Sequence, residues 1–439
     1  MSRLPALSFC PHPGPSESAR TAPARVNSFT FNTERKVPTS KKQTQKKIKV
    51  LSLFSGCGGL DLGFLGGFSF SGKDYERLDT DVVFANDFDP DAVSCYNSNA
   101  LLVKDSAKSI CKDVREIEDE EFPDFDVMIA GFPCQPFSNA GNRKGVNDKN
   151  GRGTLFEECE RILKYKISQK KKPKAFLFEN VRGILSSKMP DGKTTVPNEI
   201  KARMEKLGYN VSMQLVCASD YGVPQKRYRV LIVGVDKKIG SFSFEKMKEL
   251  VYKENIPSET FGKQEKLLLG SILKDVPKEE FWEYTKATQK MIEKIGPCSH
   301  GAKALNFFKK DFEYDKMPES YREGKSWKDI PPEELTPRFK KIYDDPKKYH
   351  SPKFFRRFAF GEINGTITAS SQPENCGITH PIENRRFTVR EIARIQSFPD
   401  NYDFSKIPLQ SRYKVIGNAV PPILGWVVAK TLTETIREK

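Results

Sequence analysis

The stretch that decides the fold is IKVLSLFSGCGG, residues 48–59. A short apolar run leads directly into a Gly56-x-Gly58-Gly59 turn. Glycine tolerates the left-handed backbone of a tight turn and lets the chain approach a ligand closely. Asp61 stands where the dinucleotide fingerprint G-x-G-x-x-G would have its third glycine. The sequence therefore predicts a strand followed by a ligand-binding turn that lacks the full pyrophosphate motif.

Strand-like and helix-like segments alternate after this turn. The further apolar runs are DVVFAND (81–87), FDVMIAG (125–131), KAFLFEN (174–180) and YRVLIVGV (228–235). Helical patterns lie between them, at 89–99 and 154–168. Such alternation implies right-handed β-α-β units and a mainly parallel sheet with helices on both faces. We therefore expect an α/β fold with a Rossmann-like sheet.

The pattern divides the chain into four parts. Residues 1–46 are expected to be a disordered basic tail, since ten basic and only two acidic side chains occur in residues 1–49 among several prolines. Residues 47–235 carry the regular alternation. Residues 236–380 are rich in Lys, Glu, Phe and Pro without a clear period, which indicates a smaller, irregular domain. Residues 381–439 contain two more helical patterns and are expected to return to the α/β unit.

Composition narrows the class of protein. The net charge of +16 favours a polyanionic partner, although half of the excess lies in the tail. No run approaches the ~18 apolar residues of a membrane helix and no secretory signal is visible, so we expect a cytoplasmic protein without a membrane partner. The nine cysteines include no C-x-x-C pair, and the four histidines have no metal-ligand spacing. We therefore expect neither a disulfide framework nor a bound metal.

Residues at the ends of the strands suit a nucleoside ligand, because ligands bind at the carboxyl edge of such a sheet. Asp87 could accept hydrogen bonds from both ribose hydroxyls, Phe88 could lie on an adenine face, and Asp113 could accept a bond from the adenine amino group. Each feature alone is weak, since strand-end acids are common. Together with the glycine turn they favour S-adenosylmethionine over a nicotinamide dinucleotide.

Reactive side chains follow the next strands. The segment GFPCQPFS (131–138) surrounds Cys134 with two prolines and a glycine, which places its thiol at the open edge of the sheet as a candidate nucleophile. The fourth strand delivers Glu179 to the same edge, where a carboxyl could give a proton or a hydrogen bond to a ring nitrogen. Arg227 and Arg229 share one face of an extended chain, and two guanidiniums suit a carbonyl oxygen or a phosphate.

The ordered motifs FSGCGG, GFPCQPFS, ENV, QKRYR, REIARIQSFPD and GNAVPP resemble those of the DNA (cytosine-5) methyltransferase family, restriction–modification type. The resemblance covers residues 48–235 and 380–439, and it is specific in combination. It implies an S-adenosylmethionine-dependent methyltransferase sheet, with residues 236–380 in the place of the target-recognition domain. It also implies a monomer that methylates C5 of cytosine in a specific double-stranded DNA sequence and protects host DNA from a separately encoded restriction endonuclease.

The resemblance also implies roles for single residues. Cys134 would add to C6 of a flipped-out cytosine, Glu179 would hold and protonate N3, and Arg227 would bind O2, with Arg229 bracing the site. The cofactor pocket would be lined by Phe54, Gly56, Gly58, Leu60, Asp87, Phe88, Asp113 and Val114 and closed by Asn418, Ala419 and Val420. DNA contacts are expected from Gln135, Ser138, Arg143, Thr366 and Thr368, although the segment around Thr366 could equally be a plain polar strand.

Three other functions remain open at this point. Relatives that act on tRNA carry a Cys-Phe-Thr element in the recognition region, and this chain has none. A non-catalytic DNA-binding module on the same scaffold would predict a broken motif, yet Cys134, Glu179 and Arg227 are all present. A nicotinamide-dependent oxidoreductase is opposed by the missing third glycine.

Overall fold

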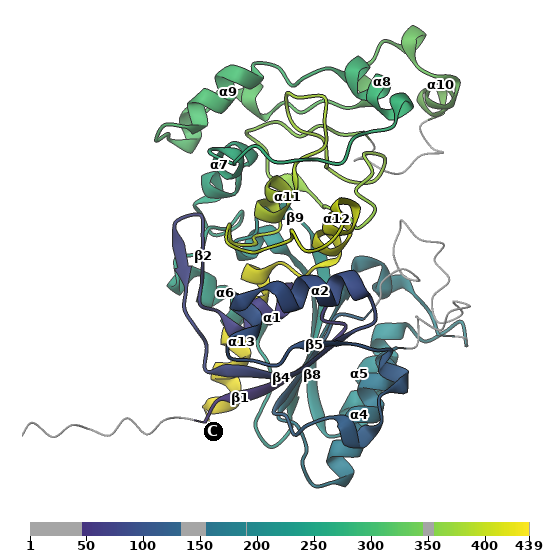
Figure 1. Ribbon diagram of the computed structural model, residues 1–439, viewed down its shortest axis with the longest axis vertical. Helices are drawn as coiled ribbons and strands as arrows, with labels where there is room; N and C mark the ends of the chain where they lie inside the picture. Colours follow the sequence, from purple (N-terminus) through teal and green to yellow (C-terminus); the bar gives the residue numbers. More distant parts are fainter. Residues whose placement is uncertain (1–45, 133–154, 190, 346–354, 439) are drawn as a thin grey trace, which may run out of the picture. The chain divides into compact units, whose positions relative to one another are not determined.

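A seven-stranded β-sheet forms the centre of the computed structural model, which describes residues 46–132, 155–189, 191–345 and 355–438 (Figure 1). Its strands are β1 (Ile48–Leu53), β4 (Thr80–Asp87), β5 (Ser109–Cys111), β6 (Val127–Ala130), β7 (Ala175–Val181), β8 (Tyr209–Cys217) and β10 (Tyr228–Asp236). Two small ribbons pair β2 (Phe68–Phe70) with β3 (Lys73–Tyr75) and β9 (Gln225–Lys226) with β11 (Asn364–Gly365). The predicted apolar runs thus form strands, as β-branched and aromatic residues favour.

The sheet has the strand order β5-β4-β1-β6-β7-β10-β8. The first five of these pair in parallel, whereas β10 runs antiparallel to both β7 and β8. The prediction of an α/β fold with a Rossmann-like sheet is confirmed. The sequence analysis missed β8 and the direction of β10. Only a short segment, residues 218–227, joins these two strands, and without a long crossover β10 must run back along β8.

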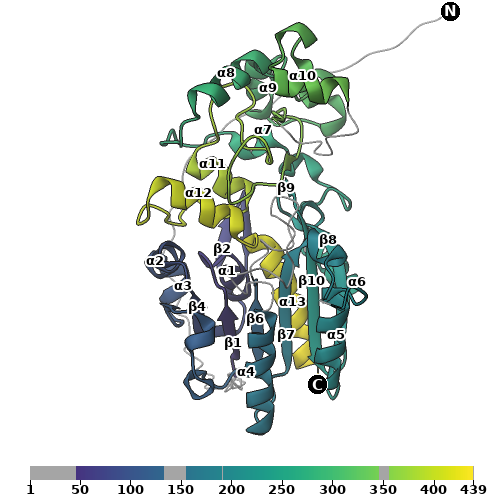
Figure 2. The same ribbon diagram turned by 90° about the vertical axis from the view of Figure 1, so that its right-hand side faces the viewer.

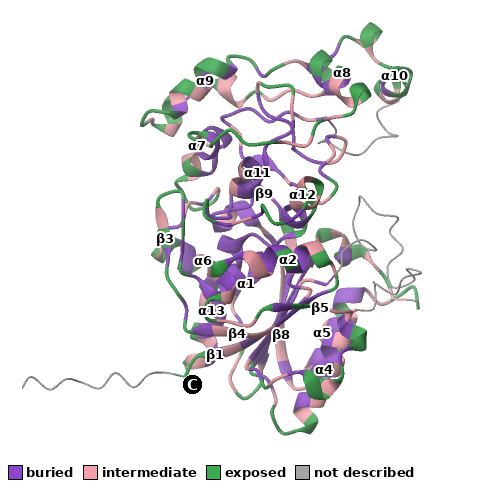
Figure 3. Cartoon of the chain, in the orientation of Figure 1, coloured by how far each residue is buried: buried purple, intermediate pink, exposed green. Residues whose placement is uncertain are grey.

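Both faces of the sheet are buried under helices. In β6, Val127 and Ile129 face one side and Met128 and Ala130 face the other, and all four are 0% exposed. A strand covered on both faces reads as a continuous apolar run, which explains why these strands were visible in the sequence. Figure 2 shows the helical layers, and Figure 3 shows the buried residues between them.

The helices on the two faces come from different parts of the chain. The bounds are α1 (Gly59–Leu65), α2 (Pro90–Ser98), α3 (Ala100–Val103), α4 (Phe156–Ser168), α5 (Val196–Lys206), α6 (Phe244–Lys253), α7 (Leu269–Leu273), α8 (Lys286–Ile295), α9 (Gly301–Phe308), α10 (Pro337–Asp344), α11 (Val389–Ile395), α12 (Leu409–Asn418) and α13 (Pro422–Arg437). Helices α4 and α5 pack on the face of Met128, and α1, α2, α6 and α13 pack on the face of Val127.

The last helix, α13, lies directly against the first, α1. A Cβ on Gly63 would lie 2.6 Å from the backbone of Gly425, so the two helices touch through their glycines. Nε1 of Trp426 donates a hydrogen bond of 3.0 Å to the carbonyl oxygen of Glu76. Within the described ranges, Leu409–Arg437 is the stretch long and apolar enough to cross a membrane. Its most apolar window is 89% buried, as a core helix would be.

Residues 236–380 contain a small apolar core of their own. It joins α8 and α10 through Ile292, Trp327 and Phe339, among other side chains. Arg357 lies at 1% exposure near this core and donates a hydrogen bond of 3.2 Å to the carbonyl oxygen of Ile292. The expected domain boundaries at 235 and 380 stay predictions.

Candidate active site

Glu179 and Arg229 form an ion pair at the carboxyl edge of the parallel strands. Nε of Arg229 lies 2.7 Å from Oε1 of Glu179, and the two side chains are 11% and 10% exposed. In the antiparallel register Leu231 lies opposite Glu179 and Arg229 lies opposite Val181. A Cβ on Gly131 would lie 3.6 Å from Oε2 of Glu179, so the end of β6 borders the same carboxylate. The edge thus presents a carboxylate and a guanidinium side by side.

Arg227 lies in a different environment. It is 1% exposed, and its guanidinium donates hydrogen bonds to the carbonyl oxygens of Ile367 at 2.8 Å and of Gly417 and Ala419 at 3.0 Å. A guanidinium held in this way braces the backbone and is withdrawn from a substrate. The expected roles, substrate binding by Arg227 and bracing by Arg229, stay predictions, and the geometry places Arg229 beside Glu179 while backbone carbonyls hold Arg227.

The predicted nucleophile follows the last described residue of this edge. Nδ2 of Asn180 donates a hydrogen bond of 3.4 Å to the carbonyl oxygen of Phe132, which ties the end of β7 to the chain leaving β6. Cys134 and the predicted DNA-contacting residues Gln135, Ser138 and Arg143 lie outside the described residues. Their roles stay predictions.

The turn after β1 has the left-handed backbone that its glycines predict. Phe54, Gly56 and Gly58 have φ angles of 55°, 56° and 83°. A Cβ on Gly58 would lie 2.3 Å from Cδ1 of Leu102, whereas a Cβ on Gly56 would meet nothing within 4 Å. Gly58 is therefore required for packing, and Gly56 borders open space where a ligand can approach the backbone. Leu60, also predicted for the pocket, is 8% exposed at the start of α1.

Asp87 is bound to this turn by its own carboxylate. Oδ2 accepts a hydrogen bond of 2.8 Å from the amide of Gly56, and Oδ1 accepts one of 2.9 Å from the amide of Asp89. Burial raises the pKa of Asp87 above the usual carboxyl value, and the backbone hydrogen bonds oppose this shift. Each oxygen keeps acceptor capacity for a ribose hydroxyl. Phe88 follows at 65% exposure, a large aromatic face open to stacking.

Ile110 is a surface residue of this region that the sequence analysis missed. It is 37% exposed, and β5 places it opposite Asn86, next to Asp87 in β4. Two large apolar side chains, Ile110 and Phe88, are therefore exposed near the ends of these strands. The only sequence signal was the three-residue strand β5, too short to show a period.

Asp113 and Val114 form the start of a short 3₁₀ turn. Nη2 of Arg115 lies 2.5 Å from Oδ2 of Asp113, and the amide of Arg115 donates to Oδ1 at 3.0 Å. The side-chain hydrogen bond from Arg115 lowers the pKa of Asp113. Val114 is 3% exposed and packs inward. The partner Arg115 was not predicted from the sequence. An adenine bound at Asp113 would share the carboxylate with Arg115.

The C-terminal segment returns to the glycine turn, as its predicted role requires. A Cβ on Gly59 would lie 2.3 Å from the carbonyl oxygen of Val420 and 3.3 Å from Cβ of Ala419. Ala419 and Val420 are each 8% exposed, while Asn418 is exposed. The Tyr402 hydroxyl donates to the carbonyl oxygen of Cys57 and strengthens the same junction.

Thr366 and Thr368 flank the fully buried Ile367. Oγ1 of Thr366 donates a hydrogen bond of 2.9 Å to the carbonyl oxygen of Lys226, and Oγ1 of Thr368 donates one of 3.1 Å to Oδ1 of Asn375. Both threonines are half-buried and carry protein partners, so base reading by them stays a prediction.

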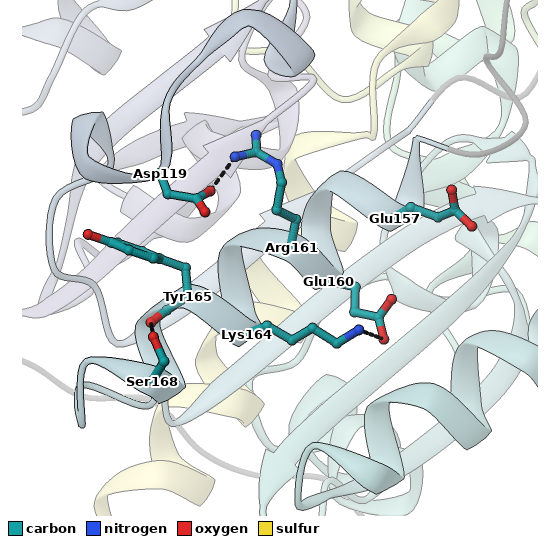
Figure 4. A pocket seen from close by; sticks show the side chains of 7 residues that line it. All are labelled: Asp119, Glu157, Glu160, Arg161, Lys164, Tyr165 and Ser168. Carbon is teal, nitrogen blue, oxygen red and sulfur yellow. Dashed lines mark hydrogen bonds and ion pairs between the residues drawn. The ribbon is translucent and has the colours of Figure 1, made fainter.

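A surface hollow on α4 lies apart from this edge. It is lined by Asp119, Glu157, Glu160, Arg161, Lys164, Tyr165 and Ser168 (Figure 4). Arg161 is ion-paired with Asp119, and Lys164 is ion-paired with Glu160. Because these charges neutralise one another locally, we assign the chemistry to the sheet edge. In the described part of the chain, no group of three or more His, Cys, Asp or Glu side chains could hold a metal ion.

Comparison with known proteins supports a single family. A family model described as C-5 cytosine-specific DNA methylase matches residues 48–434. The chain is 34% identical over 396 residues to the Type II methyltransferase M.FnuDI of Fusobacterium nucleatum, covering 89% of this chain and 96% of that relative. It is 31% identical over 398 residues to the Type II methyltransferase M.NgoPII of Neisseria gonorrhoeae, covering 90% of this chain and 97% of the relative.

Solved structures share the fold at lower identity. The S. pombe Dnmt2 methyltransferase matches with a TM-score of 0.54 and 17% identity, covering 88% of this chain and 99% of that chain. The Entamoeba histolytica methyltransferase EhMeth matches with a TM-score of 0.51 and 17% identity, covering 90% of this chain and 99% of that chain. At these identities the likeness concerns the fold alone.

Proposed function

The chain belongs to the C-5 cytosine-specific DNA methylase family and is a DNA cytosine-5 methyltransferase, and we propose that it transfers a methyl group from S-adenosylmethionine to a flipped cytosine through a covalent cysteine adduct. The observation that carries the proposal is the Glu179–Arg229 pair, 2.7 Å apart at the edge where β6 leads toward Cys134. Because the matching family is one of DNA methylases and the relatives are Type II methyltransferases, a tRNA substrate and an inert DNA-binding module are disfavoured.

The proposed reaction begins at carbon 6 of cytosine. The thiolate of Cys134 forms a bond to C6, and the displaced electron pair moves through the ring toward N3 and O2 while C5 becomes nucleophilic. Glu179 gives a hydrogen bond or a proton to N3, and Arg229 stabilises the charge that develops on O2. C5 would take the methyl group as the methyl–sulfur bond of the donor breaks and S-adenosylhomocysteine leaves. N3 then returns any proton to Glu179, a base removes the C5 proton, and the C5–C6 double bond re-forms as the C6–sulfur bond breaks and releases the thiolate.

The substrate base must leave the helix before this chemistry can occur. Extruding a paired base from a duplex costs about a few kcal/mol. Hydrogen bonds from the Glu179–Arg229 pair to the flipped base offset part of this free energy. The carboxyl and the guanidinium, at 10% and 11% exposure, suit N3 and O2 of a cytosine. The target-recognition role stays with residues 236–380, with Thr366 and Thr368 as the proposed contacts.

The glycine turn and the ends of β4 and β5 fit S-adenosylmethionine. Open space at Gly56 admits the cofactor, the carboxylate of Asp87 suits ribose hydroxyls, and the exposed ring of Phe88 suits adenine. The bound cofactor would supply an electrophilic methyl group. Of the residues proposed to close the pocket, Ala419 and Val420 meet the chain at Gly59.

The biological role we propose is protection of host DNA. The named relatives are Type II methyltransferases, which favours double-stranded DNA as the partner and a cognate restriction endonuclease encoded separately. We further propose that the protein acts as a monomer in the cytoplasm, associated with the nucleoid in a bacterial host.

The test is expression in a host that lacks DNA methylation, followed by bisulfite sequencing of the genomic DNA. We expect one short sequence motif to be protected at a single cytosine, and no protection from a Cys134→Ser variant. Absence of any protected cytosine, from folded protein that binds S-adenosylmethionine, would overturn the proposal.

A further inference from the structure

Three buried polar side chains connect segments that are far apart in the sequence. Gln225 and Gln396 are 0% exposed and Arg227 is 1% exposed. We call these three residues the polar bridge. Together they join the entry to β10, the segment 366–369 that is proposed to contact DNA, and the segment 416–420 that is proposed to contact the cofactor.

Arg227 forms the direct link of the polar bridge. Its Nη1 donates to the carbonyl oxygen of Ile367 at 2.8 Å, between the two threonines. Its Nη2 donates to the carbonyl oxygens of Gly417 and Ala419, both at 3.0 Å. The guanidinium is a rigid planar fork, so one group fixes the two segments at a constant spacing.

The two glutamines form a second link in parallel with the first. The amide of Ile367 donates to Oε1 of Gln225 at 3.1 Å, and Nε2 of Gln225 donates to Oε1 of Gln396 at 2.8 Å. Nε2 of Gln396 then donates to the carbonyl oxygen of Ile416 at 2.6 Å. Ile367 is therefore held through both its carbonyl and its amide.

Backbone packing makes this junction stiff. A Cβ on Gly417 would lie 2.4 Å from the carbonyl carbon and oxygen of Thr368, so the two backbones are in contact. Gly417 immediately precedes Asn418, and Thr368 is a proposed DNA contact. A shift of either segment must displace the other or break hydrogen bonds in a fully buried place, which is costly.

We propose that Arg227 is a positioning residue that couples cofactor binding at residues 418–420 to DNA binding at Thr366 and Thr368. The identities of the two ligands rest on the proposed function, and the coupling itself rests on the polar bridge. When one ligand shifts its own segment, the fixed spacing moves the other segment with it, so the second ligand meets a site that is already adjusted. Linkage requires the effect to be reciprocal, and couplings of this kind change affinity by about 5- to 150-fold.

The experiment measures four dissociation constants on the full chain. S-adenosylhomocysteine is titrated with and without a duplex oligonucleotide carrying the motif found by bisulfite sequencing, and the duplex is titrated with and without S-adenosylhomocysteine. For the unaltered protein we expect each ligand to raise the affinity of the other by at least about fivefold. For Arg227→Lys we expect both ligands still to bind alone, with the coupling factor reduced to near one.

Two further variants keep the test decisive. Gln396→Met removes the second link without touching Arg227, and it should also lower the coupling factor. It therefore tests the inference even where Arg227→Lys does not fold. Arg357→Lys is the matched control, because Arg357 is equally buried but donates within residues 236–380 and to residues 383 and 384. It should lose stability and keep the coupling factor.

The outcomes separate this inference from the proposed function. Unchanged coupling in both Arg227→Lys and Gln396→Met, or an equal loss in Arg357→Lys, would overturn the inference. A coupling factor of one in an unaltered protein that methylates DNA would overturn the inference alone. Absence of methylation in the bisulfite experiment would overturn the proposed function and this inference with it.

Discussion

The guanidinium of Arg229 meets the carboxylate of Glu179 across two neighbouring strands that run in opposite directions, β10 and β7. In a wholly parallel sheet, the first residues of a strand lie at the edge opposite to its neighbour's last residues. The reversal of β10 brings its beginning to the edge where β7 ends. The carboxyl group and the guanidinium of the proposed site therefore depend on one antiparallel strand.

Removing the guanidinium of Arg229 should reduce turnover far more than cofactor binding. For Arg229→Ala we expect kcat to fall by roughly 10²–10³-fold, the loss typical of one donor to a developing oxyanion. Arg229→Lys should recover part of this, since it keeps the charge without the planar fork. Transfer of a tritiated methyl group to DNA measures kcat, and titration with S-adenosylhomocysteine measures cofactor affinity.

The control for this prediction is Arg203→Ala. Arg203 is ion-paired with Glu157 and Glu160 between α5 and α4, on the face of the sheet and not at its edge. Turnover should be nearly unchanged in this variant. A nearly normal kcat for Arg229→Ala would show that Arg229 does not act on the substrate.

Replacing the thiol of Cys134 should abolish turnover and leave cofactor affinity nearly unchanged. A serine hydroxyl is a much weaker nucleophile than a thiolate at neutral pH, so no adduct at C6 can form. Duplex DNA with 5-fluorocytosine at the target position should become covalently attached to a peptide containing residue 134, because the fluorine cannot leave as the proton does. Cys134→Ser should give no attachment, and substantial surviving activity in it would refute the mechanism.

Two alanine substitutions should distinguish the binding glycine from the packing glycine. Both Gly56 and Gly58 have positive φ, so backbone strain destabilises each alanine variant by about 1–2 kcal/mol. Gly56→Ala meets open space and should mainly weaken S-adenosylhomocysteine binding. Gly58→Ala would place its Cβ 2.3 Å from Leu102 and should lower the melting temperature much more. Equal cofactor affinity in Gly56→Ala and the unaltered protein would contradict the assigned pocket.

Two buried groups should give opposite pH dependences of stability. Burial raises the pKa of Asp61 to about 6, and its Oδ1 accepts a hydrogen bond of 3.1 Å from the Tyr96 hydroxyl. Because the folded state holds the proton more tightly, stability from Asp61 is present below pH ~4 and is lost as pH rises to about 6. Burial lowers the pKa of His380 to about 4, so its stability is present above pH ~6.5 and is lost as pH falls toward 4.

Each of these shifts corresponds to about 3 kcal/mol, and in the unaltered protein they largely cancel between pH 4 and 6.5. Chemical denaturation at pH 5 and pH 7 should therefore show a rise in relative stability with pH for Asp61→Asn. The same comparison should show a fall with pH for His380→Gln. If both variants follow the pH profile of the unaltered protein, the two groups titrate as in the unfolded chain.

Much of the fold was visible in the sequence because its decisive strands are buried on both faces. A continuous apolar run such as residues 125–131 indicates a strand without knowledge of the strands that pair with it. Strand β8 was missed because five of its middle residues, from Ser212 to Val216, mix polar and apolar types, and four of them are only half-buried. Its absence from the prediction also hid the hairpin that reverses β10.

The sequence predicted which residues belong to the candidate site better than it predicted how they are arranged in space. Glu179 follows an apolar strand, and its position at the edge could be expected from that alone. The different surroundings of Arg227 and Arg229 could not be predicted, because a two-residue spacing places both on one face of an extended chain. Residue 227 precedes β10 and is enclosed by the backbone near residues 367 and 417–419, contacts more than 130 residues away in sequence.

The contact between α1 and α13 also has a consequence for synthesis on the ribosome. The apolar face of α1 is covered by α13, which is translated about 360 residues later, roughly 18–72 s at ordinary elongation rates. During that interval the glycine turn lacks its closing segment. We therefore expect a nascent chain to be unable to modify DNA until α13 has been translated.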